Sequence, residues 1–106
     1  MARYLLQVAY TQSGVQGVLK EGGTSRRDTI AKLVANTGGT MESFDFAFGA
    51  DDVIAILDMP DHASVAAISM AVGASGAATV RTTPLISAEE IDRAAGISVG
   101  YRAPGT

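Results

Sequence analysis

Residues 41–59 read MESFDFAFGADDVIAILDM, and this stretch decides the fold. In its first part, 41–48, three phenylalanines alternate with small or acidic residues, as in a strand that is buried on one face. Residues 49–52 have the composition of a turn, and a second strand at 53–59 completes a β-hairpin. Because residues 53–57 are apolar at every position, this second strand should lie inside the sheet, between two neighbours.

The sequence before the hairpin predicts one strand and two helical segments. Residues 4–10 alternate and form the first strand. A short helical segment begins at Thr11 and is broken by the glycines at positions 22 and 23. A second helix should begin at Ser25, whose hydroxyl can cap it, and end at Gly38-Gly39.

The sequence after the hairpin predicts a helix, an edge strand and a last short helix. Asp61 is expected to cap the first of these helices, which ends within residues 73–76. The strand at 78–85 contains Pro84, which favours a position at the edge of the sheet. A short helix over 87–95 follows it.

The resulting order, β-α-β-β-α-β-α, predicts an α+β, ferredoxin-like fold. In this arrangement an antiparallel four-stranded sheet, with strand order 4-1-3-2, carries helices on one side. Neither an internal repeat nor a second domain is visible in the 106 residues. We therefore predict one domain over residues 1–96 and a C-terminal tail, 97–106, that is mobile or reaches a neighbouring subunit.

Several short motifs, in this order along the chain, resemble the GYD domain family of small bacterial and archaeal proteins. They are residues 46–56, Gly38-Gly39 before them, and Pro60-Asp61, Thr82-Thr83 and Glu89-Glu90 after them. The resemblance covers residues 3–95 and departs from the family at one position. Gly49 and Asp52 match the glycine and aspartate of the Gly-Tyr-Asp motif, whereas Asp51 stands where its tyrosine is expected. The family is similar to dimeric α/β-barrel proteins, in which two ferredoxin-like sheets pack face to face, so the resemblance implies a fold and no particular reaction.

Composition and charge exclude several classes of function. Apolar residues make up 47% of the chain and charged residues 18%, and the net charge of −3 argues against binding to nucleic acid. The chain has no cysteine, which excludes disulfides, thiolate catalysis and thiolate metal sites. Residues 1–7 do not form a signal peptide, and we expect a cytoplasmic protein. Residues 63–80 carry no charge but are mostly Ala, Ser and Gly, so we expect no membrane span.

We expect the chain to form a homodimer or a larger homo-oligomer. A four-stranded sheet with helices on one side leaves its other face open, and the strand at 53–57 makes part of that face apolar. Exposing apolar surface costs about 25 cal/mol for each Å² left in water. Two such faces that pack together remove this cost.

A polar set on the open face is the candidate ligand site. The aromatic residues are expected to pack under the helices: Tyr4, Tyr10, Phe44, Phe46 and Phe48. The opposite face then carries the candidate ligand-binding residues Gln7, Ser43, Asp45, Arg81 and Thr83, together with Arg3 and Thr79. Asp45 and Arg81 lie on opposite edge strands, about 14 Å apart, so they should meet only across a dimer or through a ligand. If the face assignment is inverted, the aromatic residues could instead stack a flat ligand.

His62 is the only histidine and the candidate catalytic base. It falls in the first turn of a helix, whose dipole favours the neutral imidazole, and a neutral imidazole near a cleft can accept a proton. It is otherwise an exposed residue at a helix start. The pair Asp51-Asp52 could bind a hard cation, but hairpin turns favour aspartate for local reasons. We predict no metal site and no cofactor, and we expect Asp52 to accept hydrogen bonds from turn amides near Gly49.

Three functions remain open at this point. The first is an oligomeric protein that binds a small molecule between or beside its packed sheets. The second is a cofactor-independent isomerase or oxygenase of the dimeric α/β-barrel kind, which uses His62 or an aspartate for proton transfer. The third is a structural or accessory subunit whose tail, 98–106, docks on a partner.

Overall fold

Four antiparallel strands form one sheet in the computed structural model, which describes residues 1–106. The strands are β1 (Ala2–Tyr10), β2 (Thr40–Phe46), β3 (Val53–Met59) and β4 (Ala78–Pro84). Their spatial order is β2-β3-β1-β4, which is the predicted ferredoxin-like order. As its apolar sequence predicted, β3 lies between two neighbours, and β4, which ends at Pro84, is an edge strand.

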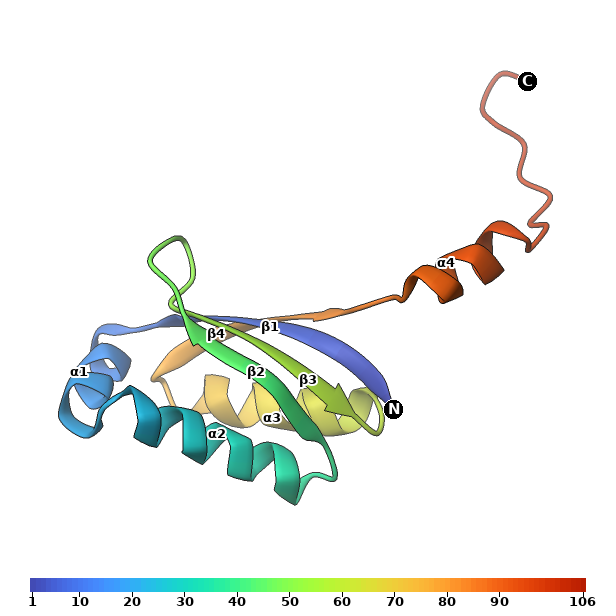
Figure 1. Ribbon diagram of the computed structural model, residues 1–106. Helices are drawn as coiled ribbons and strands as arrows, with labels where there is room; N and C mark the ends of the chain where they lie inside the picture. Colours follow the sequence, from blue (N-terminus) through green and yellow to red (C-terminus); the bar gives the residue numbers. More distant parts are fainter.

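Two helices cover one side of the sheet, a third lies at one end of it, and a fourth lies away from it (Figure 1). The covering helices are α2 (Gly23–Asn36) and α3 (His62–Ala74), and the helix at the end of the sheet is α1 (Gln12–Glu21). The fourth, α4 (Ala88–Ala95), follows β4. None of the four combines the length and the apolar character needed to cross a membrane.

The start of α3 was predicted correctly and the start of α2 was not. Asp61 caps α3, because its carboxylate accepts a hydrogen bond from the amide of Ser64 at 2.8 Å. The predicted cap at Ser25 is wrong: α2 begins at Gly23 and has no side-chain cap. Gly22 has a φ of 88°, a left-handed conformation that glycine adopts without strain, so the chain turns directly from α1 into α2.

The hydrophobic core lies between the covered face of the sheet and the helices α2 and α3. Alternate residues of β1 and β3 point into it, and Val34, Val65 and Ile68 meet them from the helices. The buried sheet residues of this core are Tyr4, Leu6, Ala55, Leu57 and Met59.

The three phenylalanines at positions 44, 46 and 48 lie on the predicted face of the sheet only as far as β2 extends. Phe44 packs against the core, whereas 45% of the surface of Phe46 is exposed. Phe48 is fully exposed, so its predicted place under the helices is wrong. Phe46 pairs with Val53, the first residue of β3, and the chain beyond Phe46 therefore leaves the sheet as a loop, residues 47–52.

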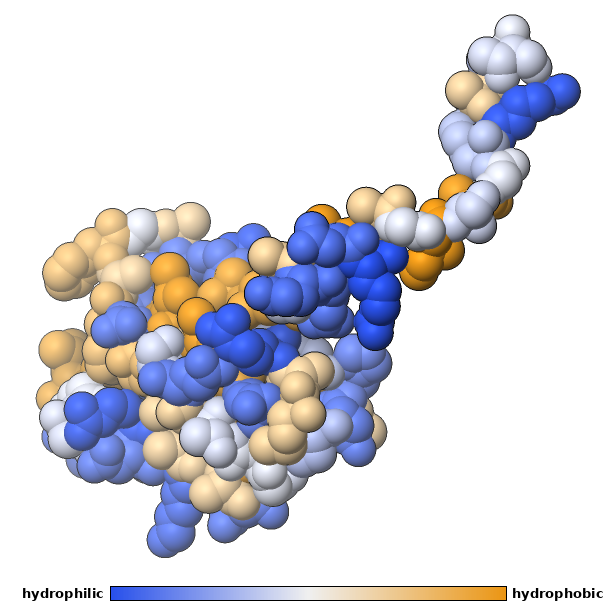
Figure 2. Space-filling model, turned by 45° about the vertical axis from the view of Figure 1, so that its right-hand side comes forward, coloured by the Kyte–Doolittle hydropathy of each residue, from blue (hydrophilic) through white to orange (hydrophobic).

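The C-terminal segment of the chain extends away from the sheet and its helices. Every residue from Ile86 to Thr106 is exposed, including all of α4. We call residues 86–106 the arm. Figure 1 shows the arm leaving β4 and pointing away from the rest of the molecule, and Figure 2 shows hydrophobic surface along it.

Candidate functional site: the open sheet face

The strand register places all five candidate ligand-binding residues on the open face, in two adjacent rows that run across the sheet. Each row crosses the strands in the order β2, β3, β1, β4. The first row is Asp45, Ile54, Gln7 and Arg81, and the second is Ser43, Ile56, Leu5 and Thr83. The polar residues thus lie on three strands and flank an apolar centre, Ile54, Ile56 and Leu5.

A carboxylate from the loop 47–52 joins two residues of the first row. Asp51 accepts hydrogen bonds from Arg81 Nη2 through both of its oxygens, at 3.0 and 2.8 Å. Its Oδ2 also accepts a hydrogen bond from Gln7 Nε2 at 3.1 Å. We call Gln7, Asp51 and Arg81 the Asp51 cluster. Asp45 takes no part in it, since β3 and β1 separate Asp45 from Arg81.

The loop is held in place by Asp52, the neighbour of Asp51. The amide of Tyr10 donates a hydrogen bond to Asp52 Oδ2 at 2.7 Å, and the amide of Asp52 donates to the carbonyl of Val8 at 2.8 Å. The expected bonds from turn amides to the Asp52 side chain are therefore wrong. The last residues of β1 extend beyond the start of β3, and Asp52 satisfies their backbone groups instead.

Arg81 keeps donors available although it is paired. Asp51 contacts only Nη2, so Nη1 and Nε of the guanidinium make no hydrogen bond within the chain. The Arg81 side chain is 66% exposed, whereas that of Asp51 is 12% exposed. The carboxylate thus holds the guanidinium through Nη2 and leaves Nη1 and Nε available to donate to an anionic acceptor such as a carboxylate.

The opposite end of the open face carries a second charged group. Arg3 Nε donates a hydrogen bond to Glu42 Oε2 at 2.8 Å, and Glu42 is the extra residue of a bulge in β2. This hydrogen bond raises the pKa of Arg3 above its ordinary value. Asp58 pairs with Arg3 in the register, and its Oδ1 is buried without a hydrogen-bond partner.

Apolar side chains lie between the two charged groups. Ile54 is 38% exposed, and Leu5 and Ile56 are half-buried with no helix above them. Figure 2 shows hydrophobic surface between hydrophilic residues on the upper side of the molecule, where no helix covers the sheet. The loop 47–52, which carries the exposed Phe48, rises on this same side (Figure 1). The open face therefore offers an apolar centre with polar ends.

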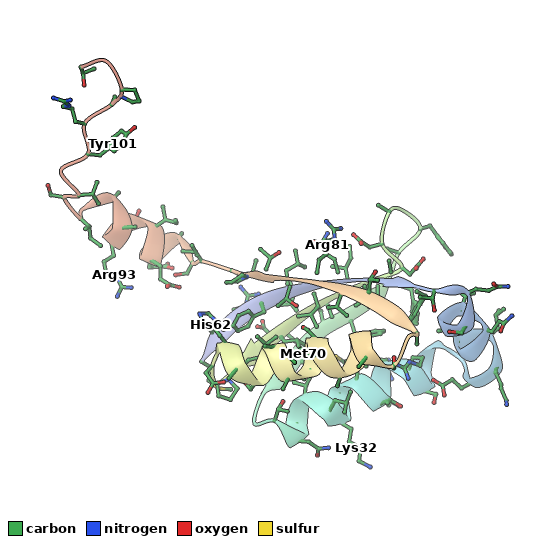
Figure 3. All side chains as sticks on the ribbon, turned by 180° about the vertical axis from the view of Figure 1, so that it is seen from behind. Lys32, His62, Met70, Arg81, Arg93 and Tyr101 are labelled. Carbon is green, nitrogen blue, oxygen red and sulfur yellow. The ribbon has the colours of Figure 1, made fainter.

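His62 lies on the other side of the sheet from Arg81 (Figure 3). Its Nδ1 is hydrogen-bonded to the hydroxyl of Tyr4, and the two rings meet edge to face with centroids 5.6 Å apart. Tyr4 is buried in the core, so this contact fixes the imidazole at the start of α3. The structure therefore does not bring the candidate base together with the candidate ligand-binding residues. No group of three or more His, Cys, Asp and Glu residues is arranged to hold a metal ion.

Comparison with models of protein families identifies the family of the chain. The family model described as the GYD domain matches residues 4–95. The chain belongs to the GYD domain family. The match includes α4, and residues 1–3 and 96–106 lie outside it. Comparisons with curated proteins and with solved structures gave no match.

Two residues on the open side of this GYD domain were not among the predicted site residues: Asp51, which pairs with Arg81, and Phe48, which is fully exposed. The sequence pattern presents Asp51 as a turn residue or a cation ligand, at the position where the family resemblance leads us to expect tyrosine, and it presents Phe48 as a core residue. The departure at Asp51 is the one signal in the sequence that could have directed attention to it. Phe48 gave no such signal, because its alternation with Phe44 and Phe46 continues past the end of the strand.

Proposed function

We propose that this GYD domain is a homodimeric small-molecule-binding protein, in which two open sheet faces pack together and the Asp51 cluster binds the ligand at the edge of the interface. The ligand would be a small metabolite with a carboxylate or a similar planar anionic group. The observation that carries the proposal is the guanidinium of Arg81, oriented by Asp51 and left with two free donor groups on an uncovered face.

The apolar centre of the open face supports the dimer. Ile54 and Ile56 belong to the innermost pair of strands, and leaving them in water is unfavourable in proportion to their exposed area. Phe48, on the loop beside them, is an exposed aromatic side chain of the kind that anchors protein interfaces. A partner sheet would cover both features.

The Asp51 cluster supports a binding role more strongly than catalysis. It contains an acceptor, an amide and a cation, which suit recognition of a polar molecule. It contains no histidine or lysine, its one carboxylate is already paired with Arg81, and His62 lies across the sheet with Nδ1 engaged by Tyr4. The isomerase or oxygenase hypothesis accordingly has no observation in its favour.

The proposal is tested by native mass spectrometry of the protein purified from its own host. We expect a dimer or a multiple of it that carries a small additional mass. In the Arg81→Gln variant that mass should be absent, while the dimer remains. The matched control is Arg27→Gln, which removes another exposed arginine that is paired with an aspartate, Asp28, at 3.1 Å.

Each outcome of this experiment tests a different part of the proposal: the ligand site, the role of Arg81, or the dimer. Loss of the retained mass in Arg81→Gln and its retention in Arg27→Gln would support the site. The same mass on all three proteins would contradict a role for Arg81. A bare monomer in the wild type would contradict both the dimer and a ligand site at its interface.

A further inference from the structure

The arm carries an amphipathic helix with no partner. In α4, Ala88, Ile91 and Ala95 lie on one face, and four of the other five residues are charged. The hydroxyl of Ser87 accepts a hydrogen bond from the amide of Glu90, and the Glu90 carboxylate accepts one from the amide of Ser87. This capping box stabilises the helix start without help from the rest of the molecule. Yet Ile91 remains 51% exposed, so the apolar face of α4 is formed and uncovered.

The helical side of the molecule contains an apolar groove. It lies between α2 and α3, has the sheet as its floor and a volume of about 310 Å³, and fourteen of its eighteen lining residues are hydrophobic. Thr29 and Leu33 of α2 form one wall, and Ile68 and Val72 of α3 form the other. A groove of this kind is the usual receptor for the apolar face of an amphipathic helix.

The charges of the two elements are complementary. The helix α2, which forms one wall of the groove, carries three basic residues, at positions 26, 27 and 32, and one acidic residue. The helix α4 has the reverse composition, with three acidic residues, at positions 89, 90 and 92, and one basic residue. A second copy of α4 laid along α2 would therefore be attracted to it by charge as well as by burial of its apolar face.

The arm of one chain does not face its own groove. The arm leaves the sheet after Pro84, which pairs with Tyr4. The groove extends along β1 from Leu6 to Tyr10, toward the other end of the same two strands. Tyr4 and Tyr10 are about 20 Å apart at the rise of an extended strand, and the arm points away from the groove (Figure 1). The groove is thus better placed to receive the arm of another molecule.

We propose that the arm of one GYD domain docks on the helical side of a second copy, with Ile91 in the groove between α2 and α3. This contact uses surfaces that are distinct from the open sheet face, so together with the proposed sheet-to-sheet dimer, on which this step rests, it builds a larger assembly. Ala88 and Ala95, on either side of Ile91, allow a close approach of the two helices.

A disulfide cross-link between two different chains tests the contact directly, because the natural chain has no cysteine. The full-length variants Ile91→Cys and Thr29→Cys are purified separately, mixed and oxidised, and the mixed covalent dimer is measured by mass spectrometry. Thr29 is exposed and lines the groove. The control replaces Thr29→Cys by Ala35→Cys, also exposed on α2 but about 120° further around the helix.

We expect the Ile91–Thr29 mixed dimer to exceed the Ile91–Ala35 mixed dimer at least about tenfold, because docking raises the effective concentration of one thiol near the other. Equal yields would contradict the proposal. A product made only of two Ile91→Cys chains would also contradict it, since the arms would then pair with each other.

The mass of the native assembly gives a second, independent readout. Ile91→Gln should reduce the wild-type assembly to the sheet-to-sheet dimer, whereas Arg93→Gln, on the charged side of the same helix, should leave it unchanged. An unaltered assembly in Ile91→Gln would contradict arm docking. So would a small amphiphile retained equally by the wild type, by Ile91→Gln and by Arg81→Gln, since it would then occupy the groove and not the Asp51 cluster.

Discussion

The two faces of the sheet share one backbone but differ in what covers them: helices pack on one face, and no helix packs on the other. On the covered face, Leu57 and Met59 are completely buried under the helices. On the open face, Ile54 and Ile56, which alternate with them along the same strand, have no helix above them. The covered face is uniformly apolar at its centre, whereas the open face combines apolar residues with the Asp51 cluster. A strand that is apolar on both faces therefore indicates that both faces are to be covered, one by its own helices and the other, in our proposal, by a second copy.

The largest expected effect comes from shortening a side chain on the covered face. Leu57→Ala should lower the free energy of unfolding by about 2–5 kcal/mol, because it leaves a cavity in the core. Ile56→Ala, the adjacent residue on the other face, should cost less, and its cost should depend on protein concentration, since it weakens the dimer. Urea unfolding at two protein concentrations measures both. Equal, concentration-independent losses would show that the two faces do not differ in this way.

The next effect distinguishes two phenylalanines of the hairpin. Phe48→Ala should change the free energy of unfolding of the monomer by no more than about 0.5 kcal/mol, because the side chain is fully exposed. It should raise the dissociation constant of the dimer at least about tenfold if Phe48 is an interface anchor. Phe44→Ala, which removes a side chain packed against the core, should instead destabilise the fold. Analytical ultracentrifugation and thermal unfolding measure the two effects, and an unchanged dissociation constant for Phe48→Ala would remove its proposed role.

A smaller effect on stability is expected in the Asp51 cluster. Asp51→Asn should lower the free energy of unfolding by at most about 1 kcal/mol, because Arg81 is largely exposed and such pairs are screened by water. The loss should shrink as salt is added. A double-mutant cycle with Arg81→Gln measures the coupling between the two residues, and a coupling of zero at low salt would show that Asp51 does not hold the guanidinium.

The smallest effect concerns the start of α3, on the covered side. The hydrogen bond from the Ser64 amide lowers the pKa of Asp61 below its ordinary value of about 3.9. The carboxylate therefore stabilises the fold above that pH, and this contribution is lost as the pH falls through the lowered pKa. The difference in stability between the wild type and Asp61→Ala should be present at pH 7 and should diminish below pH ~4. A difference that persists unchanged at pH ~2 would contradict this account.

The sequence predicted those features that depend on neighbouring residues. Alternation along β1 and β3 gave the faces of the sheet, and the spacing of Asp61 and Ser64 gave the cap of α3. The assignment of Gln7, Asp45 and Arg81 to one face was correct for the same reason, because a strand alternates with a period of two.

Features that depend on the path of a loop could not be predicted in this way. Asp51 and Arg81 are thirty residues apart, and their contact exists only because Asp52 ties the loop to the end of β1. The alternation of phenylalanines did not reveal that β2 ends before Phe48. Likewise, nothing near His62 in the sequence indicated that Tyr4, on another strand, would hold its ring on the covered side.

We propose that the open sheet face is an interface, and one pair of charged substitutions can test this. Ile54→Glu places a carboxylate in the centre of the open face, and Leu19→Glu places one on α1, where the native leucine is 81% exposed. Masses measured in solution by light scattering should show that Ile54→Glu loses the sheet-to-sheet dimer, while Leu19→Glu retains the wild-type assembly. If Ile54→Glu folds and keeps the wild-type mass, the open face is not the interface. The Asp51 cluster would then not lie at a dimer interface, as we propose.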